Sequence, residues 1–130
     1  MKSHGFWQNH SSAWCMETIQ LGCETYTVSE AIAIMRHNSQ DKTYLLAQEL
    51  IAAKLNIACR EANSSCIADA IVAADAWLCD HPIGSGVTGG SVWNQIRGTH
   101  TQLERYNTGN LCAPSCDDDA SLRRIQLQQQ

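Results

Sequence analysis

The sequence lacks the features that mark nucleic-acid-binding and membrane-spanning proteins. Its 130 residues carry nine basic and thirteen acidic side chains, a net charge of −4. No run or helix face of Lys and Arg appears, so we expect no nucleic-acid partner. No apolar run approaches the roughly 20 residues that span a bilayer. Residues 1–10, MKSHGFWQNH, lack the hydrophobic segment of a signal peptide. We therefore expect neither membrane insertion nor a signal peptide within this chain.

Motifs of known catalytic sites are also missing. The chain contains no GxSxG, HExxH or GxGxxG pattern, no EF-hand spacing and no CxxCH haem motif. Residues 83–90, IGSGVTGG, are rich in glycine and predict a flexible loop, but they lack the Lys and the spacing of a phosphate-binding loop. These absences predict that the chain is not an enzyme and uses no cofactor.

Cysteine, by contrast, is abundant. Such a density in a chain of this size is typical of an oxidising compartment. The seven cysteines predict three disulfides and one remaining thiol, and they are Cys15, Cys23, Cys59, Cys66, Cys79, Cys112 and Cys116. Spacing leaves the connectivity open. Proximity along the chain favours three pairs, which are Cys15–Cys23, Cys59–Cys66 and Cys79 with either Cys112 or Cys116.

A metal or redox site is the alternative use of these residues. The segments Cys79-Asp80-His81 and Cys112-x3-Cys116 could supply thiolates and an imidazole. Structural zinc sites are normally built from paired CxxC-like motifs, and only one loose pair exists here. We therefore favour disulfides and expect no metal. A metal-binding or redox role for Cys79, His81, Cys112 and Cys116 stays open as an alternative.

Residues 41–61, DKTYLLAQELIAAKLNIACRE, predict a central helix. They contain no Gly or Pro and are rich in good helix formers. Apolar residues recur with helical period over most of the circumference, which is typical of a helix surrounded by others. Glu49 and Asn56 share the remaining side. We interpret this side as the solvent-exposed stripe and Glu49 as a surface carboxylate, because charged residues are usually solvated.

The flanking segments complete a mainly α fold. Residues 18–27 predict a small hairpin that turns near Gly22. Thr27 and Glu30 match a capping box, so a helix should follow at 29–37. Further helices are predicted at 65–80 and from 91 to about 107, with Gly98 as a weak point in the last. The expected fold is a compact, disulfide-linked bundle of about four helices with an N-terminal β-hairpin. It forms a single domain at 5–116, followed by a polar segment at 117–130 that we expect to be disordered.

The N-terminal segment 5–14, GFWQNHSSAW, is aromatic and irregular. Trp7, His10 and Trp14 would lie on one face if this segment were helical. We favour a lid on the core, because large aromatics dominate core burial. Trp14 should then contribute more than Trp7, which lies nearer the terminus. A ligand platform made of the same three residues is the alternative.

Two stretches of the sequence resemble a known type of module. Residues 5–14 are similar to the G-[FY]-W-K-x-H-P-x-x-W opening of a module found in secreted and cell-surface bacterial multidomain proteins, with Ser11 in place of its Pro. Residues 46–56 match its core helix, L-A-x-x-L-I-A-A-K-L-N. The resemblance covers about residues 5–110. It implies an extracellular or cell-surface location and a module type, and it implies no activity or site residue.

The functional expectation follows from these points. We expect a non-enzymatic extracellular or cell-surface module that serves in adhesion, attachment or surface assembly. Its partner would be a protein or a surface polymer, and a homo-oligomer is compatible with the odd cysteine. The other hypothesis is a self-assembling subunit of a surface layer or fibre, with the odd cysteine or the Gly-rich loop at the contact.

Overall fold

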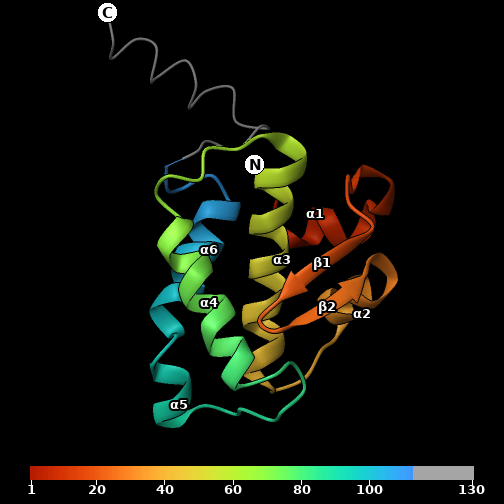
Figure 1. The fold of residues 1–130 in the computed structure, drawn as a ribbon. Coiled ribbons are helices and arrows are strands. Elements are labelled where there is room, and N and C mark those ends of the chain that lie inside the picture. Colours follow the sequence, from red (N-terminus) through yellow and green to blue (C-terminus); the bar gives the residue numbers. More distant parts are fainter. Residues whose placement is uncertain (113–130) are drawn as a thin grey trace, which may run out of the picture.

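The protein is mainly helical (Figure 1) in a computed structural model that describes residues 1–112. Four substantial helices, a two-stranded antiparallel hairpin and three disulfides confirm the predicted fold class. The elements are α1 (His4–Asn9), the 3-10 helix η1 (Ser11–Ala13), β1 (Thr18–Leu21), β2 (Glu24–Thr27), α2 (Val28–Arg36), α3 (Lys42–Arg60), α4 (Ala68–Asp80), α5 (Gly90–Asn94) and α6 (Arg97–Asn107). The predicted domain end at 116 and the segment 117–130 lie outside the described residues.

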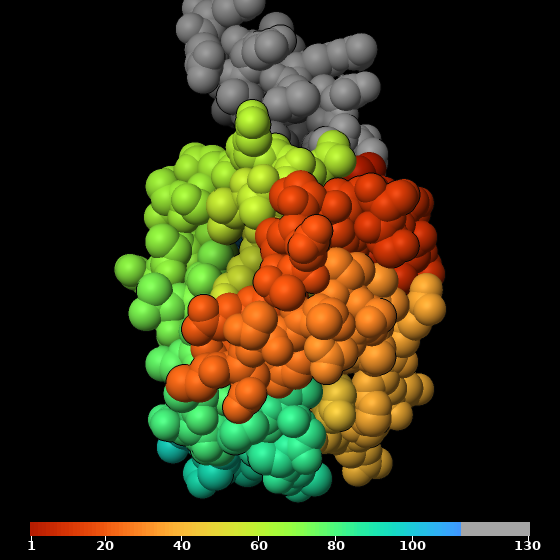
Figure 2. Space-filling view, turned by 45° about the vertical axis from the view of Figure 1, so that its right-hand side comes forward, coloured from red at the N-terminus to blue at the C-terminus, as the bar shows by residue number. Residues whose placement is uncertain are grey.

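Helix α3 runs through the middle of the fold, as predicted. It contacts α1, α2, α4, α6 and β1, and little of it reaches the face seen in Figure 2. Its apolar residues Leu46, Ala47, Leu50, Ile51, Ala52, Ala53 and Leu55 are all 0% exposed. Burying a Leu or Ile side chain contributes about 1.5–3 kcal/mol. The burial of α3 is therefore the main apolar contribution to the fold.

The polar side of α3 is also buried, which contradicts the predicted solvent-exposed stripe. Glu49 is 3% exposed and Asn56 is 0% exposed. The N-terminal residues and α6 cover this side of the helix and supply hydrogen-bonding groups to both side chains. The prediction failed because periodicity identifies a face of a helix without showing which other segment packs on it.

The hairpin has the predicted turn at Gly22. Strands β1 and β2 pair from Thr18↔Thr27 to Leu21↔Glu24. Gly22 has a positive φ of 66°, which favours glycine. A Cβ at this position would also lie 2.8 Å from the carbonyl carbon of Leu78 in α4. The turn therefore needs glycine for its backbone conformation and for its close approach to α4.

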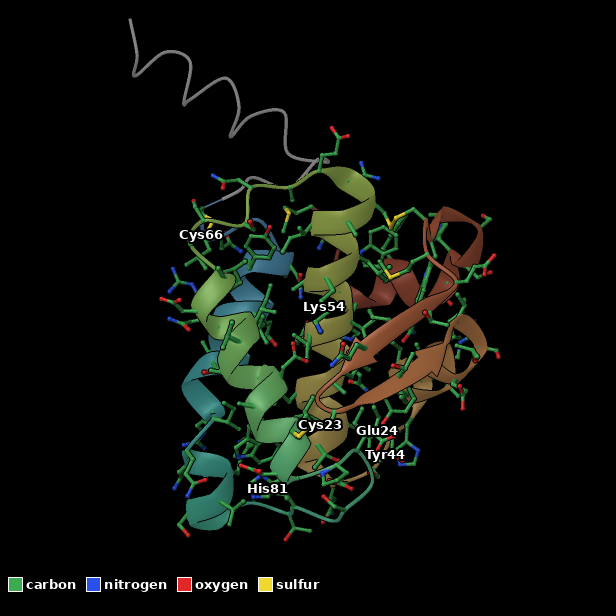
Figure 3. The ribbon with its side chains drawn as sticks, viewed as in Figure 1. Cys23, Glu24, Tyr44, Lys54, Cys66 and His81 are labelled. Carbon is green, nitrogen blue, oxygen red and sulfur yellow. A yellow bond between two sulfur atoms is a disulfide. The ribbon has the colours of Figure 1, made fainter. Side chains whose placement is uncertain are left out.

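A salt bridge fixes the hairpin to two helices. The ammonium of Lys54, which Figure 3 labels on α3, lies 2.9 Å from the Asp75 carboxylate of α4 and donates to the Gln20 carbonyl at 2.6 Å. The Gly22 N–H donates to the same carboxylate at 2.8 Å. Charge-assisted hydrogen bonds of this kind are stronger than neutral ones. Asp75 therefore joins β1, α3 and α4 at one point.

Helix α2 begins where the sequence predicts. The Thr27 hydroxyl accepts a hydrogen bond from the Glu30 N–H at 3.2 Å, and the Glu30 carboxylate accepts one from the Thr27 N–H at 2.9 Å. This reciprocal pair is the predicted capping box. The hydrogen bond from the Thr27 backbone N–H is the largest influence on the Glu30 carboxylate, and together with the Thr27 side chain it lowers the pKa of Glu30.

The C-terminal helices differ from the prediction at their ends. Helix α4 starts at Ala68, because residues 64–67 form a turn in which the Ser64 carbonyl accepts from the Ile67 N–H. The single helix predicted from residue 91 is two helices, α5 and α6, which are separated at residues 95–96. Trp93 and Ile96, which lie next to this break, are both buried, at 6% and 5% exposure. Gly98, the predicted weak point, lies inside α6.

The Gly-rich loop 83–90 is held against the start of α3. The Asp41 carboxylate accepts hydrogen bonds from the Gly86 N–H at 3.0 Å and the Val87 N–H at 3.2 Å. The Thr43 hydroxyl accepts one from the Gly84 N–H at 2.9 Å. Burial alone would raise the pKa of Asp41, but its hydrogen bonds with Thr43, Gly86 and Val87 together outweigh burial and lower that pKa. The predicted flexible loop is thus anchored over its first half.

The predicted disulfide pairs are wrong, although their number is confirmed. The bonds are Cys15–Cys59, Cys23–Cys79 and Cys66–Cys112, and Cys116 lies outside the described residues. Residues 15 and 23 lie on either side of the extended strand β1. At about 3.3 Å per residue, a strand keeps such residues too far apart for a disulfide. Each observed bond instead joins segments 44 to 56 residues apart.

We predict that Gly22→Ala lowers the free energy of unfolding by more than about 1 kcal/mol. The new methyl group would strain the positive φ and meet the α4 backbone. Gly98→Ala is the matched control, because its Cβ would point into open space from within α6. That change should raise stability by up to about 1 kcal/mol. Urea unfolding of both variants measures the two effects, and equal midpoints would contradict this account of the hairpin turn.

Candidate functional site

The buried carboxylate of Glu49 is paired with a histidine from the N-terminal helix. The His4 Nδ1 lies 3.0 and 3.2 Å from the two Glu49 carboxylate oxygens. The Glu49 side chain is 4% exposed, whereas that of His4 is 43% exposed. An unpaired buried carboxylate is costly, so His4 supplies the charge that makes the burial of Glu49 tolerable. The pair also fixes α1 to the middle of α3.

Two histidines near Glu49 have pKa values shifted in opposite directions. The hydrogen bond to Glu49 is the largest influence on His4 and raises its pKa, with Glu104 adding to the effect and burial opposing it. Burial is the largest influence on His100 and lowers its pKa, although Glu49 and Glu104 act in the other direction. Lys42 and His4 lower it further. His4 is therefore the imidazole that favours the charged form here, and His100 the one that favours the neutral form.

Two buried amides continue this polar cluster. The Asn56 Oδ1 accepts from the Lys2 N–H at 2.8 Å and from the Trp7 indole N–H at 3.3 Å. Its Nδ2 donates to the Lys2 carbonyl at 2.8 Å and to the Asn107 Oδ1 at 3.0 Å. Asn56 thus makes the full set of hydrogen bonds open to a side-chain amide. Asn107 Nδ2 donates to the Glu49 carbonyl at 2.9 Å, which ties α6 to α3.

We name His4, Glu49, Asn56 and Asn107 the buried polar cluster. A carboxylate that orients one imidazole nitrogen is the arrangement that hydrolases and metal sites use to prepare the other nitrogen for chemistry. Within residues 1–112, however, the His4 ring has hydrogen bonds to Glu49 alone, and no hydroxyl or thiol is bonded to it. The described residues also contain no group of three or more His, Cys, Asp or Glu side chains that could hold a metal ion. The geometry of the cluster is that of a tether between α1, α3 and α6.

The sequence did not identify this cluster, although it carried a signal. Glu49 and Asn56 are separated by seven residues on a helix that is otherwise apolar on nearly all sides. A lone polar pair on such a helix can mark a buried polar contact as well as a solvated stripe. His4, Lys2 and Asn107 have no local pattern that points to α3, so only the fold brings them together.

The aromatic N-terminal residues occupy three different environments. Trp7 is 0% exposed and donates to Asn56, so it belongs to the core. Trp14 is half-buried, and its indole N–H donates to the Trp7 carbonyl at 3.0 Å. His10 is exposed and stacks on Phe6 with ring centroids 4.1 Å apart. The expected ranking of the two tryptophans is therefore reversed, since the residue nearer the terminus is the more deeply buried.

Three residues of the alternative metal or redox site, Cys79, His81 and Cys112, lie within residues 1–112, whereas Cys116 does not. Cys79 and Cys112 belong to different disulfides, with Cys23 and Cys66 respectively. His81 stacks on Trp77 with ring centroids 4.4 Å apart, and its Nδ1 lies 3.0 Å from the Trp77 carbonyl. Two of the thiols proposed as ligands are therefore oxidised.

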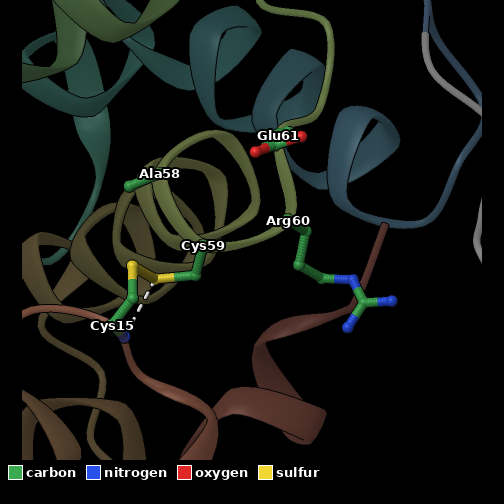
Figure 4. Close-up of a pocket in the computed structure, with 5 residues that line it drawn as sticks. All are labelled: Cys15, Ala58, Cys59, Arg60 and Glu61. Atoms are coloured by element: carbon green, nitrogen blue, oxygen red, sulfur yellow. Dashed lines mark hydrogen bonds between the residues drawn. A yellow bond between two sulfur atoms is a disulfide. The ribbon is translucent and has the colours of Figure 1, made fainter.

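An open hollow lies at the C-terminal end of α3. Its volume is about 380 Å³, and it is lined by Cys15, Ala58, Cys59, Arg60 and Glu61 (Figure 4). The Cys15–Cys59 disulfide forms one side, and the Cys15 N–H lies 3.1 Å from the Cys59 sulfur. We name these five residues the α3-end hollow. None of them was predicted as a binding residue from the sequence.

We predict that His4→Ala destabilises the fold by about 1–3 kcal/mol near neutral pH, because it leaves Glu49 buried without its partner. The pKa of His4 is raised in the fold. The pair therefore stabilises fully below the unfolded-state pKa of about 6.5 and loses this contribution as pH rises through the folded-state pKa. Urea unfolding between pH 5 and 9 should show this loss in the wild type and not in His4→Ala.

The double variant His4→Ala/Glu49→Gln is the control for that experiment, because it removes both charges. It should be less destabilised than His4→Ala, since no buried charge is left unpaired. Parallel stability-against-pH curves for wild type and His4→Ala would show that the pair carries no charge-dependent stability.

The two tryptophans give a second prediction. Trp7→Ala should cost about 3–5 kcal/mol, as expected for a fully buried aromatic. Trp14→Ala should cost about 1–2 kcal/mol, because that ring is only half-buried. Trp7→Phe keeps most of the volume and loses the bond to Asn56, so it should fall between the two. Thermal and urea melts of the three variants test this order of destabilisation. A larger loss of stability in Trp14→Ala than in Trp7→Ala would show that Trp14 makes the more important core contact.

Known proteins give no guide to this site. Comparisons of the chain with protein-family models, curated proteins and solved structures find no match.

Proposed function

We propose that the chain is a non-enzymatic interaction module that acts outside the cell or at its surface. The observation that carries the proposal is the set of three disulfides, which indicate an oxidising environment. Each bond joins two segments that are 44 to 56 residues apart in the sequence. A small scaffold fixed at so many points keeps its surface in one conformation, which lowers the entropy lost on binding.

The paired charged groups support the same proposal. Glu49 pairs with His4, and Lys54 pairs with Asp75 between secondary-structure elements. These are the groups that would carry chemistry in an enzyme, and in this fold they bond to one another. No helix within residues 1–112 is long and apolar enough to span a membrane. The two ion pairs and the resemblance of residues 5–14 and 46–56 to a surface module favour attachment to a protein or a surface polymer.

Sedimentation with insoluble polymers tests the proposal. The oxidised protein is mixed with peptidoglycan sacculi or with protein-coated beads, and the fraction left in solution is measured. We expect saturable depletion by one of these surfaces and none after reduction and alkylation, since loss of native disulfides in small domains often abolishes folding. His4→Asn should bind as the wild type does. Breakdown of a polymer that depends on His4 would contradict the proposal and assign acid–base chemistry to the His4–Glu49 pair.

Light scattering on the same sample tests the self-assembly hypothesis. A module that binds other surfaces should stay at one defined mass without polymer. Growth of large particles that reductant reverses would favour a fibre or layer subunit linked through an intermolecular disulfide.

A further inference from the structure

We propose that Asn63, in the connection between α3 and α4, is a site of N-linked glycosylation. The chain contains two N-x-[ST] sequons, Asn9-His10-Ser11 and Asn63-Ser64-Ser65, which the function proposed above does not use. Such short motifs occur by chance, so the folded structure has to decide which of them an enzyme can modify. The inference rests on the proposed function in one respect, which is the export of the chain to a compartment where glycans are attached.

The side-chain amide of Asn63 is open to modification. The residue is exposed, and its Oδ1 accepts a hydrogen bond from the Ser65 N–H at 2.9 Å. This bond fixes the side-chain oxygen and leaves the nitrogen, Nδ2, without a hydrogen bond to residues 1–112. Glycosylation uses the nitrogen, so the folded chain presents the acceptor atom without having to break a contact.

Ser65 presents the hydroxyl of the sequon in an equally open position. Its side chain is exposed, and its hydroxyl makes no hydrogen bond within the described part of the chain. Residues 61–64 belong to no helix or strand, and Figure 1 shows this connection running across one end of the fold. Surface loops tolerate local change better than the elements that they join. An enzyme can therefore bind this segment without unfolding a helix.

Asn9 has the same motif in a setting that withholds its amide. It is the last residue of α1, and its Nδ2 donates to the Gly5 carbonyl at 3.0 Å. Trp7, in the same short helix, is 0% exposed and holds α1 against the core. Modification of Asn9 would require the loss of its hydrogen bond and the displacement of a buried aromatic ring. Neither cost applies at Asn63, so the structure favours the second sequon.

The backbone at Asn63 is held by contacts that a glycan would leave intact. The Asn63 carbonyl accepts from the Tyr106 hydroxyl at 2.6 Å, and the Cys66–Cys112 disulfide joins the same connection to the segment after α6. Neither contact involves the Asn63 side chain. A glycan is a bulky, polar group that suits a surface position. The side chain of Asn63 can carry it while the connection between α3 and α4 stays in place.

The reaction needs one further reactant, an oligosaccharide linked to a polyprenyl pyrophosphate. The Nδ2 of Asn63 forms a bond to the anomeric carbon of the first sugar, and the bond between that carbon and the pyrophosphate oxygen breaks. Nδ2 gives up one proton, and the polyprenyl pyrophosphate leaves with the electron pair of the broken bond. Nothing is oxidised or reduced, so the disulfides take no part in the reaction.

Glycosylation of the purified protein in vitro tests the proposal. The oxidised chain is incubated with a single-subunit oligosaccharyltransferase that accepts N-x-[ST] sequons and with the polyprenyl-pyrophosphate oligosaccharide. Mass spectrometry of the peptides then locates the glycan. We expect one glycan per chain, at Asn63. Asn9 should be modified at least about tenfold less, because it reacts only after α1 opens locally.

The reduced and alkylated chain is the control for access, since removal of native disulfides from small domains often abolishes folding. It should carry glycans at both Asn9 and Asn63 to a similar extent. A folded protein without a glycan at Asn63 would overturn the proposal. Equal modification of the two sequons in the folded protein would overturn the argument from hydrogen bonding and burial.

Four variants assign the glycan to the groups named here. Asn63→Gln removes the acceptor and Ser65→Ala removes the hydroxyl of the sequon, so both should lose the modification. Ser65→Thr keeps the motif and should retain the glycan, and Asn9→Gln is the matched control, which should be modified as the wild type is. Melting temperatures show that each variant is folded. A glycan that persists in Asn63→Gln would contradict the assignment.

The outcome can be told apart from that of the proposed function. If Asn63 is not modified while the unglycosylated protein still sediments with a surface, the glycosylation site is wrong and the interaction module stands. If Asn63 is modified and the protein sediments with no surface, the proposed function fails and the glycosylation site stands.

Discussion

The burial of α3 on every side is the constraint from which the rest of the structure follows. A helix surrounded by other elements cannot leave Glu49 and Asn56 in water, and burying them without partners would cost several kcal/mol. The partners come from the ends of the described chain, with His4 and Lys2 on one side and Asn107 on the other. The positions of α1 and α6 are thus determined by hydrogen bonding as well as by apolar contact.

The disulfides add a second layer of constraint around that helix. Their loops of 44 to 56 residues would each remove about 4 kcal/mol of chain entropy from the unfolded state on the entropic account. None of the three bonds is local, so each can form only once the two segments that it joins have been brought together. The Cys23–Cys79 bond illustrates this, since Gly22 packs against the backbone at Leu78 and Asp75 accepts its N–H. The covalent link and the hydrogen bonds therefore specify the same arrangement of hairpin and helix.

Local features of this fold could be predicted from the sequence, and its long-range contacts could not. The capping box at Thr27, the hairpin turn at Gly22 and the extent of α3 depend on neighbouring residues, so the chain itself encodes them. The environment of Glu49 depends on which segment covers one side of α3, and periodicity does not contain that information. The predicted disulfide pairs were wrong for the same reason, because cysteines that are close in the sequence were assumed to be close in space. The α3-end hollow is lined by Cys15 and by residues 58–61, two segments far apart in the sequence, so no local pattern indicated it.

Glu49 and Glu61 show two different ways in which a residue can depart from local preference. Glu49 is a charge in an apolar environment, and the fold compensates for it with His4, so its presence is explained by the structure. Glu61 is a side chain on a backbone with a positive φ, which favours glycine, and hydrogen bonds from the Glu61 and Ala62 N–H groups to the Asn56 carbonyl hold this conformation. Residues in sparsely populated backbone conformations persist where the surrounding structure holds them. A side-chain pair thus accommodates Glu49 and backbone hydrogen bonds accommodate Glu61, so both departures belong to the architecture of the protein around α3.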